Sequence, residues 1–194
     1  KQIGHSVQKC EMIVMGGTFN AQPKKYKNKF ILGIYEALNN KKSISLEKAK
    51  LANETAKTRM VGLCIETKPD WAKAKQIDEM LEWGTTRIEL GVQQLDDKIY
   101  KKVNRGHTLQ DVIGATKECK DSALKITYHM MPGLFADKKK DIQNFKTLFS
   151  NPDFKPDGLK IYPCLVMPNT PLHSMWKKGE FTPYTSSEAA EVIA

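Results

Sequence analysis

Small and polar residues follow several short β-rich runs of this sequence, and their types are suited to binding a ligand. Gly16 and Gly17 follow the first run, where two glycines let the backbone approach a ligand closely, and Thr18 adds a hydroxyl. Glu66 follows the second run, where a carboxylate can hold hydroxyl groups. Gln93 follows the third run, and its amide both donates and accepts hydrogen bonds.

Two more candidates come later in the chain. Arg105 lies just ahead of Thr108, a predicted helix N-cap, where a guanidinium would meet a carboxylate or a phosphate. His129 lies in the fourth β-rich run. Glu89 lies inside the third run, and its carboxylate would be costly to bury unless Arg87 or an interior lysine paired with it.

Each candidate also has an ordinary structural explanation when it is taken alone. The glycines fit a tight turn, Asp70 after Glu66 fits a helix cap, Arg105 fits a solvated turn, and His129 fits a satisfied core histidine. The case for a site rests on their succession along the chain. No Ser/His/Asp triad, phosphate-binding glycine loop, zinc motif or glycosidase-type pair of carboxylates is evident.

The elements that must position these residues alternate. Helical periodicity in 26–38, 72–83, from Thr108 onward and in 141–149 separates the β-rich runs, and 187–194 begins another helix. This alternation predicts right-handed βαβ units and a parallel sheet, whose ligands bind at the carboxyl ends of the strands. Five strands are too few for a closed eight-stranded barrel, so we expect an open or partial (β/α) barrel, with a doubly wound sheet as the alternative. The expected strands are 11–15, 60–65, 87–92, 125–131 and 159–162.

The four cysteines, Cys10, Cys64, Cys119 and Cys164, are far apart in sequence. They form no Cys-x-x-Cys pair and no disulfide framework, so we expect single buried thiols in a reducing compartment, the cytoplasm. No apolar run approaches the roughly 18 residues that span a bilayer, and the first residues lack the apolar core of a signal peptide, so no membrane association is expected.

Several segments together resemble the radical S-adenosylmethionine (SAM) domain of the Elongator catalytic-subunit family. Asn-Arg-Gly-His-Thr and His-Met-Met-Pro are the most specific motifs, whereas Gly-Gly-Thr is common to many radical SAM enzymes. Their order and spacing hold across nearly the whole chain. The segments are 4–9, 13–19, 65–70, 87–93, 104–108, 129–132 and 157–163.

The resemblance implies a tRNA-modifying acetyltransferase that places a carboxymethyl group on C5 of the wobble uridine. Its cofactors would be a [4Fe–4S] cluster and SAM, with acetyl-CoA as co-substrate. The residues that match SAM-binding positions of the family are Gly16, Gly17, Thr18, Glu66, Gln93, Arg105 and His129. Lys9 matches a lysine linked to acetyl-CoA, and no residue is assigned to the catalytic step itself.

The chain departs from the family pattern in two ways. The three cysteines that hold the cluster in the family belong to a loop ahead of the position of Lys1, and none of the four cysteines here matches them, so no metal ligand is assigned. Lys68 stands where arginine is usual. We therefore expect 1–194 to be one radical SAM core domain of a longer chain, inactive alone, with the acetyltransferase domain beyond it.

Positive charge suggests the partner. The 194 residues include 31 Lys+Arg and 22 Asp+Glu, a formal net charge of +9 that fits either nucleic-acid binding or a lysine-rich soluble surface. With the resemblance, tRNA becomes the expected partner, and other Elongator subunits or self-association are possible further ones. The alternatives are a non-catalytic tRNA-binding barrel and another radical SAM oxidase or methylthiotransferase. The lysines expected to contact tRNA are Lys101, Lys102, Lys138, Lys139, Lys140 and Lys160.

Overall fold

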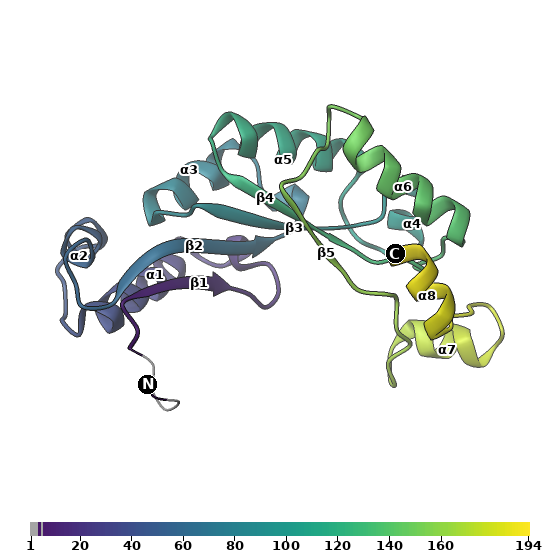
Figure 1. Ribbon diagram of the computed structural model, residues 1–194, viewed down its shortest axis with the longest axis horizontal. Helices are drawn as coiled ribbons and strands as arrows, with labels where there is room; N and C mark the ends of the chain where they lie inside the picture. The colour runs from purple at the N-terminus through teal and green to yellow at the C-terminus, as the bar shows by residue number, and fades with distance from the viewer. Residues whose placement is uncertain (1–3, 5) are drawn as a thin grey trace.

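The computed structural model describes residue 4 and residues 6–194, and it contains a five-stranded parallel sheet (Figure 1). The strands follow the order of the chain, β1-β2-β3-β4-β5, without the reversal of order that a doubly wound sheet requires. The predicted parallel sheet and partial barrel are confirmed, and the doubly wound alternative is wrong. The strands are β1 Lys9–Val14, β2 Arg59–Thr67, β3 Arg87–Gln93, β4 Lys125–Met130 and β5 Gly158–Ile161.

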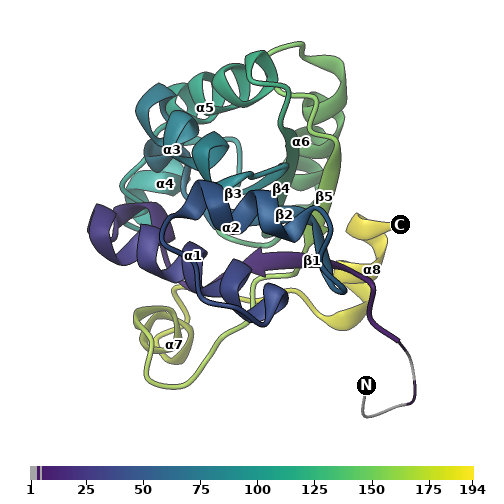
Figure 2. The same cartoon turned by 90° about the vertical axis from the view of Figure 1, so that its left-hand side faces the viewer.

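The sheet is curled, and helices α1, α3, α5 and α6 form an arc around its outer side (Figure 2). These four helices agree with the predicted ones. Two short 3-10 helices, Phe19–Ala21 and Pro69–Trp71, follow β1 and β2. The α-helices are α1 Lys24–Asn39, α2 Leu46–Asn53, α3 Ala74–Trp83, α4 Asp97–Lys102, α5 Leu109–Asp121, α6 Lys138–Ser150, α7 Pro171–Lys177 and α8 Ser186–Ile193.

The main core lies between the outer side of the sheet and this arc of helices. Alternate strand residues such as Leu63, Ile65 and Ile88 are fully buried there, against helix residues such as Ile31 and Ile77. Because the sheet is parallel and covered on this side, its outward-facing positions are almost continuously aliphatic or aromatic.

The concave side of the sheet, here called the inner face, has the opposite character. Register places Glu66 beside Glu89, and His129 beside Lys160, so the charged positions of adjacent strands lie next to one another. An interior of this kind suits a polar ligand better than the branched aliphatic layers that fill a closed barrel. The inner face comprises Lys9, Glu11, Ile13, Gly62, Cys64, Glu66, Arg87, Glu89, Gly91, Thr127, His129, Gly158 and Lys160.

Three helices were not expected from the sequence. α2 buries only Ala49 and Asn53, and α4 is six residues long, so neither has a clear apolar periodicity. α7 buries no residue fully. The expectation of buried thiols holds for Cys64, Cys119 and Cys164, but Cys10 is half-buried because β1 is an edge strand.

The C-terminal segment packs on the loops that follow β3 and β4. A second apolar cluster joins Ile99 of α4 and Leu134 of the loop after β4 to Cys164 and Phe181. α8, the helix expected at 187–194, ends the described chain. Among the described residues, no helix has the length and apolar character that a membrane crossing would need.

Candidate cofactor-binding site

A chain of polar contacts crosses the inner face near the carboxyl ends of the strands. The amide of Gly16 donates to Glu66 Oε2 at 3.2 Å, and Glu66 Oε1 lies 3.5 Å from His129 Nδ1. His129 Nε2 lies 2.8 Å from Glu89 Oε2, which also accepts a hydrogen bond from Lys160 Nζ. Side chains from β2, β3, β4 and β5 are therefore joined with a backbone amide of the loop after β1, and Glu66 and His129 meet as the sequence predicted.

Glu89 makes the most contacts in this series of polar interactions, and it was not predicted as a site residue. Its side chain is almost wholly buried, with Lys160 and His129 on one oxygen and Arg87 3.8 Å from the other. Burial opposes ionisation, but the hydrogen bonds from Lys160 and His129 outweigh it and lower the pKa of Glu89. The expected pairing with Arg87 or an interior lysine is confirmed, and both cations take part.

Gln93 and Arg105 lie beside these polar contacts, and both approach Gly91. Arg105 Nη2 donates to the carbonyl of Gly91 at 2.8 Å, and Gln93 Nε2 donates to the hydroxyl of Tyr162 at 3.4 Å. A Cβ atom at Gly91 would lie 2.5 Å from Arg105 Nη2, so a glycine is needed for this approach. Gln93 Oε1 and Arg105 Nε are buried without a hydrogen-bond partner, and they remain available to a bound ligand.

The loop after β1 supplies exposed backbone next to Glu66. Gly16 and Gly17 have φ angles of +104° and +71°, and no atom lies within 4 Å of a Cβ placed at either. These glycines are therefore required by their left-handed backbone and not by crowding. Thr18 precedes the first 3-10 helix without capping it, so its hydroxyl is not used for that purpose.

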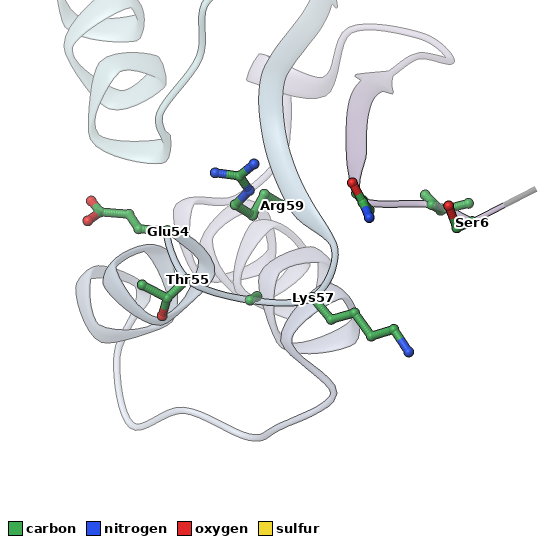
Figure 3. A pocket seen from close by; sticks show the side chains of 8 residues that line it. Ser6, Glu54, Thr55, Lys57 and Arg59 are labelled. Atoms are coloured by element: carbon green, nitrogen blue, oxygen red, sulfur yellow. The ribbon is translucent and has the colours of Figure 1, made fainter.

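Lys9 does not join the other predicted site residues. It is exposed on the inner face at the amino end of β1, seven residues before Gly16, which corresponds to roughly 20 Å along an extended strand. His5, in the same motif, lies outside the described residues. A cavity of about 510 Å³ opens at this same end of the sheet (Figure 3). It is lined by residues 6–8, 54–57 and 59, so it is separate from the site at the strand ends.

Within the described residues, four of the six predicted tRNA-contacting lysines already interact with another side chain and two do not. Lys138 pairs with Glu191 at 2.6 Å and Lys140 pairs with Asp96 at 3.0 Å. Lys102 lies over the ring of Phe135, 3.8 Å from its centroid, and Lys160 lies on the inner face. Among the described residues, Lys101 and Lys139 are exposed and have no ion-pair partner.

The described residues do not fit an iron–sulfur cluster. Burial raises the pKa values of the Cys64 and Cys164 thiols to about 11 and that of Cys119 to about 12, which disfavours the thiolate that a cluster needs. In the part of the chain that the structure describes, the one group with metal-ligand geometry is Glu66, Glu89 and His129. Within that group, Glu89 already accepts a hydrogen bond from the ammonium of Lys160.

Tyr162 is another residue that the sequence reasoning missed. It directly follows β5, half-buried, and its ring meets the His129 ring edge-on at 5.9 Å between centroids. Tyr162 is the last residue of the expected strand 159–162, so its position at a strand end was the signal that could have identified it.

Comparisons with known proteins find relatives that match the whole chain. The chain is 50% identical to the tRNA uridine(34) acetyltransferase of Methanocaldococcus infernus and 42% identical to human Elongator complex protein 3, in both cases over its whole length. It spans 36% of the length of each of these relatives. A solved structure of the M. infernus Elp3 with an N-terminal deletion is 51% identical and superposes with a TM-score of 0.96, covering 99% of this chain and 45% of that one.

The family models divide the chain in two. Residues 156–194 match the radical SAM C-terminal domain, and residues 2–149 match the Radical SAM superfamily. The match over residues 2–149 covers every strand except β5, together with Glu66, Gln93, Arg105 and His129. The chain belongs to the Radical SAM superfamily.

Proposed function

We propose that this chain is the radical SAM core of a longer tRNA-modifying enzyme, which carboxymethylates C5 of the wobble uridine with SAM and acetyl-CoA. The observation that carries the proposal is the convergence of Glu66, Gln93, Arg105 and His129 at one end of the sheet. Sequence identity of 50% and 49% over the whole chain to two proteins named tRNA uridine(34) acetyltransferase supports the choice of substrate. Because the chain spans about a third of those proteins, their activity is carried over as a proposal.

The residues at the strand ends fit SAM. The superfamily uses SAM with a [4Fe–4S] cluster, which together supply radical chemistry. The unpartnered Arg105 guanidinium nitrogen suits the SAM carboxylate, and Glu66 suits the ribose hydroxyls. Backbone carbonyls beside Gly16 and Gly17 suit the ammonium group, because the left-handed glycines leave that backbone open.

The protein's own contribution here is to hold charges in fixed places. Glu89 keeps His129 and Lys160 at the inner face, so His129 presents its second ring nitrogen toward Glu66. A pre-oriented set of this kind binds a polar cofactor without first rearranging. The cluster thiolates would come from another part of the longer protein, because the described cysteines do not fit them.

The remaining partners are proposed on the resemblance. Acetyl-CoA is assigned to Lys9, which lies on the inner face at the opposite end from Glu66, so a second domain would have to bridge the two. The tRNA is assigned to the lysine-bearing surface, and other Elongator subunits or a second copy are proposed as further partners. Free cysteines suit a reducing compartment such as the cytoplasm.

The test uses the full-length protein, loaded anaerobically with its cluster and supplied with SAM, acetyl-CoA and tRNA. We expect carboxymethyluridine at the wobble position in the digested tRNA, and SAM cleavage that depends on tRNA. A different modified nucleoside would point to another radical SAM activity. Tight tRNA binding without any cluster or SAM cleavage would point to a non-catalytic tRNA-binding barrel.

A further inference from the structure

Gln93 adopts a backbone conformation that is rare for its residue type. Its φ angle is +71°, and the amide of Gln94 donates to the carbonyl of Val92 at 2.9 Å, so Gln93 is the central residue of a γ-turn with positive φ. Such turns are strained, and a non-glycine residue adopts this backbone region at a cost in free energy. The strain persists only where surrounding contacts impose it.

Contacts on both sides impose this turn. The carbonyl of Gln93 accepts from the amide of Met131 at 2.9 Å, after a register shift between β3 and β4. The carbonyl of Gln94 accepts from the hydroxyl of Tyr100, which is itself buried. The peptide groups that flank the turn are thus tied to Met131, directly after β4, and to Tyr100 on α4.

The side chain of Gln94 continues this anchoring in the interior. It is 1% exposed, and its Nε2 donates to the carbonyl of Met131 at 2.8 Å and to Asp141 Oδ1 at 2.9 Å. Its Oε1 accepts from Asn144 Nδ2 at 2.7 Å. Every hydrogen-bonding atom of the amide group has a partner on α6 or on Met131, the residue after β4, so Gln94 has no freedom to reorient.

The network ends in the C-terminal segment. Asp141, 2% exposed, uses its second oxygen to accept from the amide of Gly133 at 2.7 Å and from the hydroxyl of Tyr184 at 2.8 Å. The ring of Tyr184 lies over Gly133, whose Cβ would come within 3.0 Å of it. Tyr184 precedes α8, so one hydroxyl joins the C-terminal segment to the turn that carries Gln93.

We propose that Gln94, Asp141 and Tyr184 are positioning residues that hold Gln93 in its left-handed turn, so that docking of the C-terminal segment sets the affinity for SAM. The proposal rests on the assignment of Gln93 to the cofactor site. It gives the strained turn a cause, because this turn carries the side-chain amide of Gln93 to the hydroxyl of Tyr162.

The experiment is a double-mutant cycle in the full-length, cluster-loaded protein, read by anaerobic calorimetric titration with SAM. Tyr184→Phe removes the hydroxyl and keeps the ring over Gly133, and it should weaken SAM binding about five- to tenfold. Gln93→Ala should weaken it at least as much. In the Gln93→Ala background, Tyr184→Phe should add nothing, because it acts through Gln93.

Tyr35→Phe is the matched control, since the Tyr35 hydroxyl is buried and donates to the Trp83 carbonyl at 3.0 Å, on the helix side of the core. It should lower the unfolding temperature and leave SAM affinity unchanged. The proposal is overturned if Tyr184→Phe behaves like this control, or if the two site variants act additively. An unchanged affinity in Gln93→Ala would instead refute the cofactor assignment of Gln93. Asp141→Asn provides a second variant if Tyr184→Phe does not fold.

Discussion

At the scale of single residues, the inner face is a set of charges that satisfy one another. Glu89 is buried with three partners, Arg87, His129 and Lys160. Removing one of them would leave a buried carboxylate whose charge is no longer fully compensated. Arg105 differs, because its Nη2 is used by the Gly91 carbonyl and its Nε is unpartnered. Arg105 is therefore the side chain at which ligand binding can be tested with the least disturbance of the network.

Arg105→Ala should weaken SAM binding by more than about tenfold and change tRNA affinity by less than about twofold. Arg105→Lys should recover only part of the loss, since the charge is kept and the planar fork is not. Calorimetry with SAM and filter binding with tRNA measure the two affinities. Arg59→Ala, at the amino end of β2, is the control for a lost positive charge. An equal loss of both affinities in Arg105→Ala would show that Arg105 contacts phosphate.

His107 carries a pH dependence. Its ring is 4% exposed, packs edge-on against Tyr100 at 4.4 Å between centroids, and has no hydrogen-bond partner on either nitrogen. Burial, with a smaller contribution from Arg105, lowers its pKa to about 4. Below its ordinary pKa of about 6.5 the unfolded chain therefore binds more protons than the folded one, and stability falls as pH drops toward about 4.

The expected loss that is specific to His107 is about 2–3 kcal/mol between about pH 7 and about pH 4.5. Urea unfolding at the two pH values measures it. In His107→Phe, which keeps the ring contact with Tyr100, the decrease in the free energy of unfolding should be smaller by that amount. If the variant and the original protein lose the same free energy, the buried neutral histidine is not the cause.

At the scale of elements, the parallel sheet places the site and the loops shape it. The sequence predicted that residues at successive strand ends would meet, and Glu66 with His129, and Gln93 with Arg105, do so. It did not predict the γ-turn at Gln93 or the anchoring by Gln94, because both depend on contacts with Asp141 and Met131 far along the chain. A strand pattern predicts which face a residue occupies, but hydrogen bonds between distant loops decide its backbone.

Helix caps give an element-scale prediction. Thr108 and Thr185 each form a capping box, with Asp111 on α5 and Glu188 on α8. Thr108→Ala should lower the global free energy of unfolding by about 1 kcal/mol, since α5 packs in the main core. Thr185→Ala should mainly raise amide hydrogen exchange in α8, which buries only Val192. Urea unfolding and hydrogen exchange separate the two, and equal global effects would show that α8 is part of the main cooperative unit.

At the scale of the whole molecule, the curled sheet leaves a polar inner face open on one side, while helices close the other (Figures 1 and 2). The formal net charge of +9 does not by itself mark one tRNA-binding area. The predicted lysines should differ in how much they add to tRNA affinity. A lysine that already pairs with a carboxylate gains less binding free energy from a phosphate, because it must give up that ion pair.

The resulting prediction concerns salt-dependent tRNA binding. Lys101→Ala and Lys139→Ala should each weaken affinity and reduce the slope of log affinity against log salt concentration by roughly one counterion. Lys138→Ala and Lys140→Ala, whose ammonium groups pair with Glu191 and Asp96, should change both quantities less. Filter binding over a range of salt concentrations measures the slopes. A slope near zero in the original protein would remove the electrostatic argument, whereas larger effects at the paired lysines would mean that tRNA breaks those ion pairs when it binds.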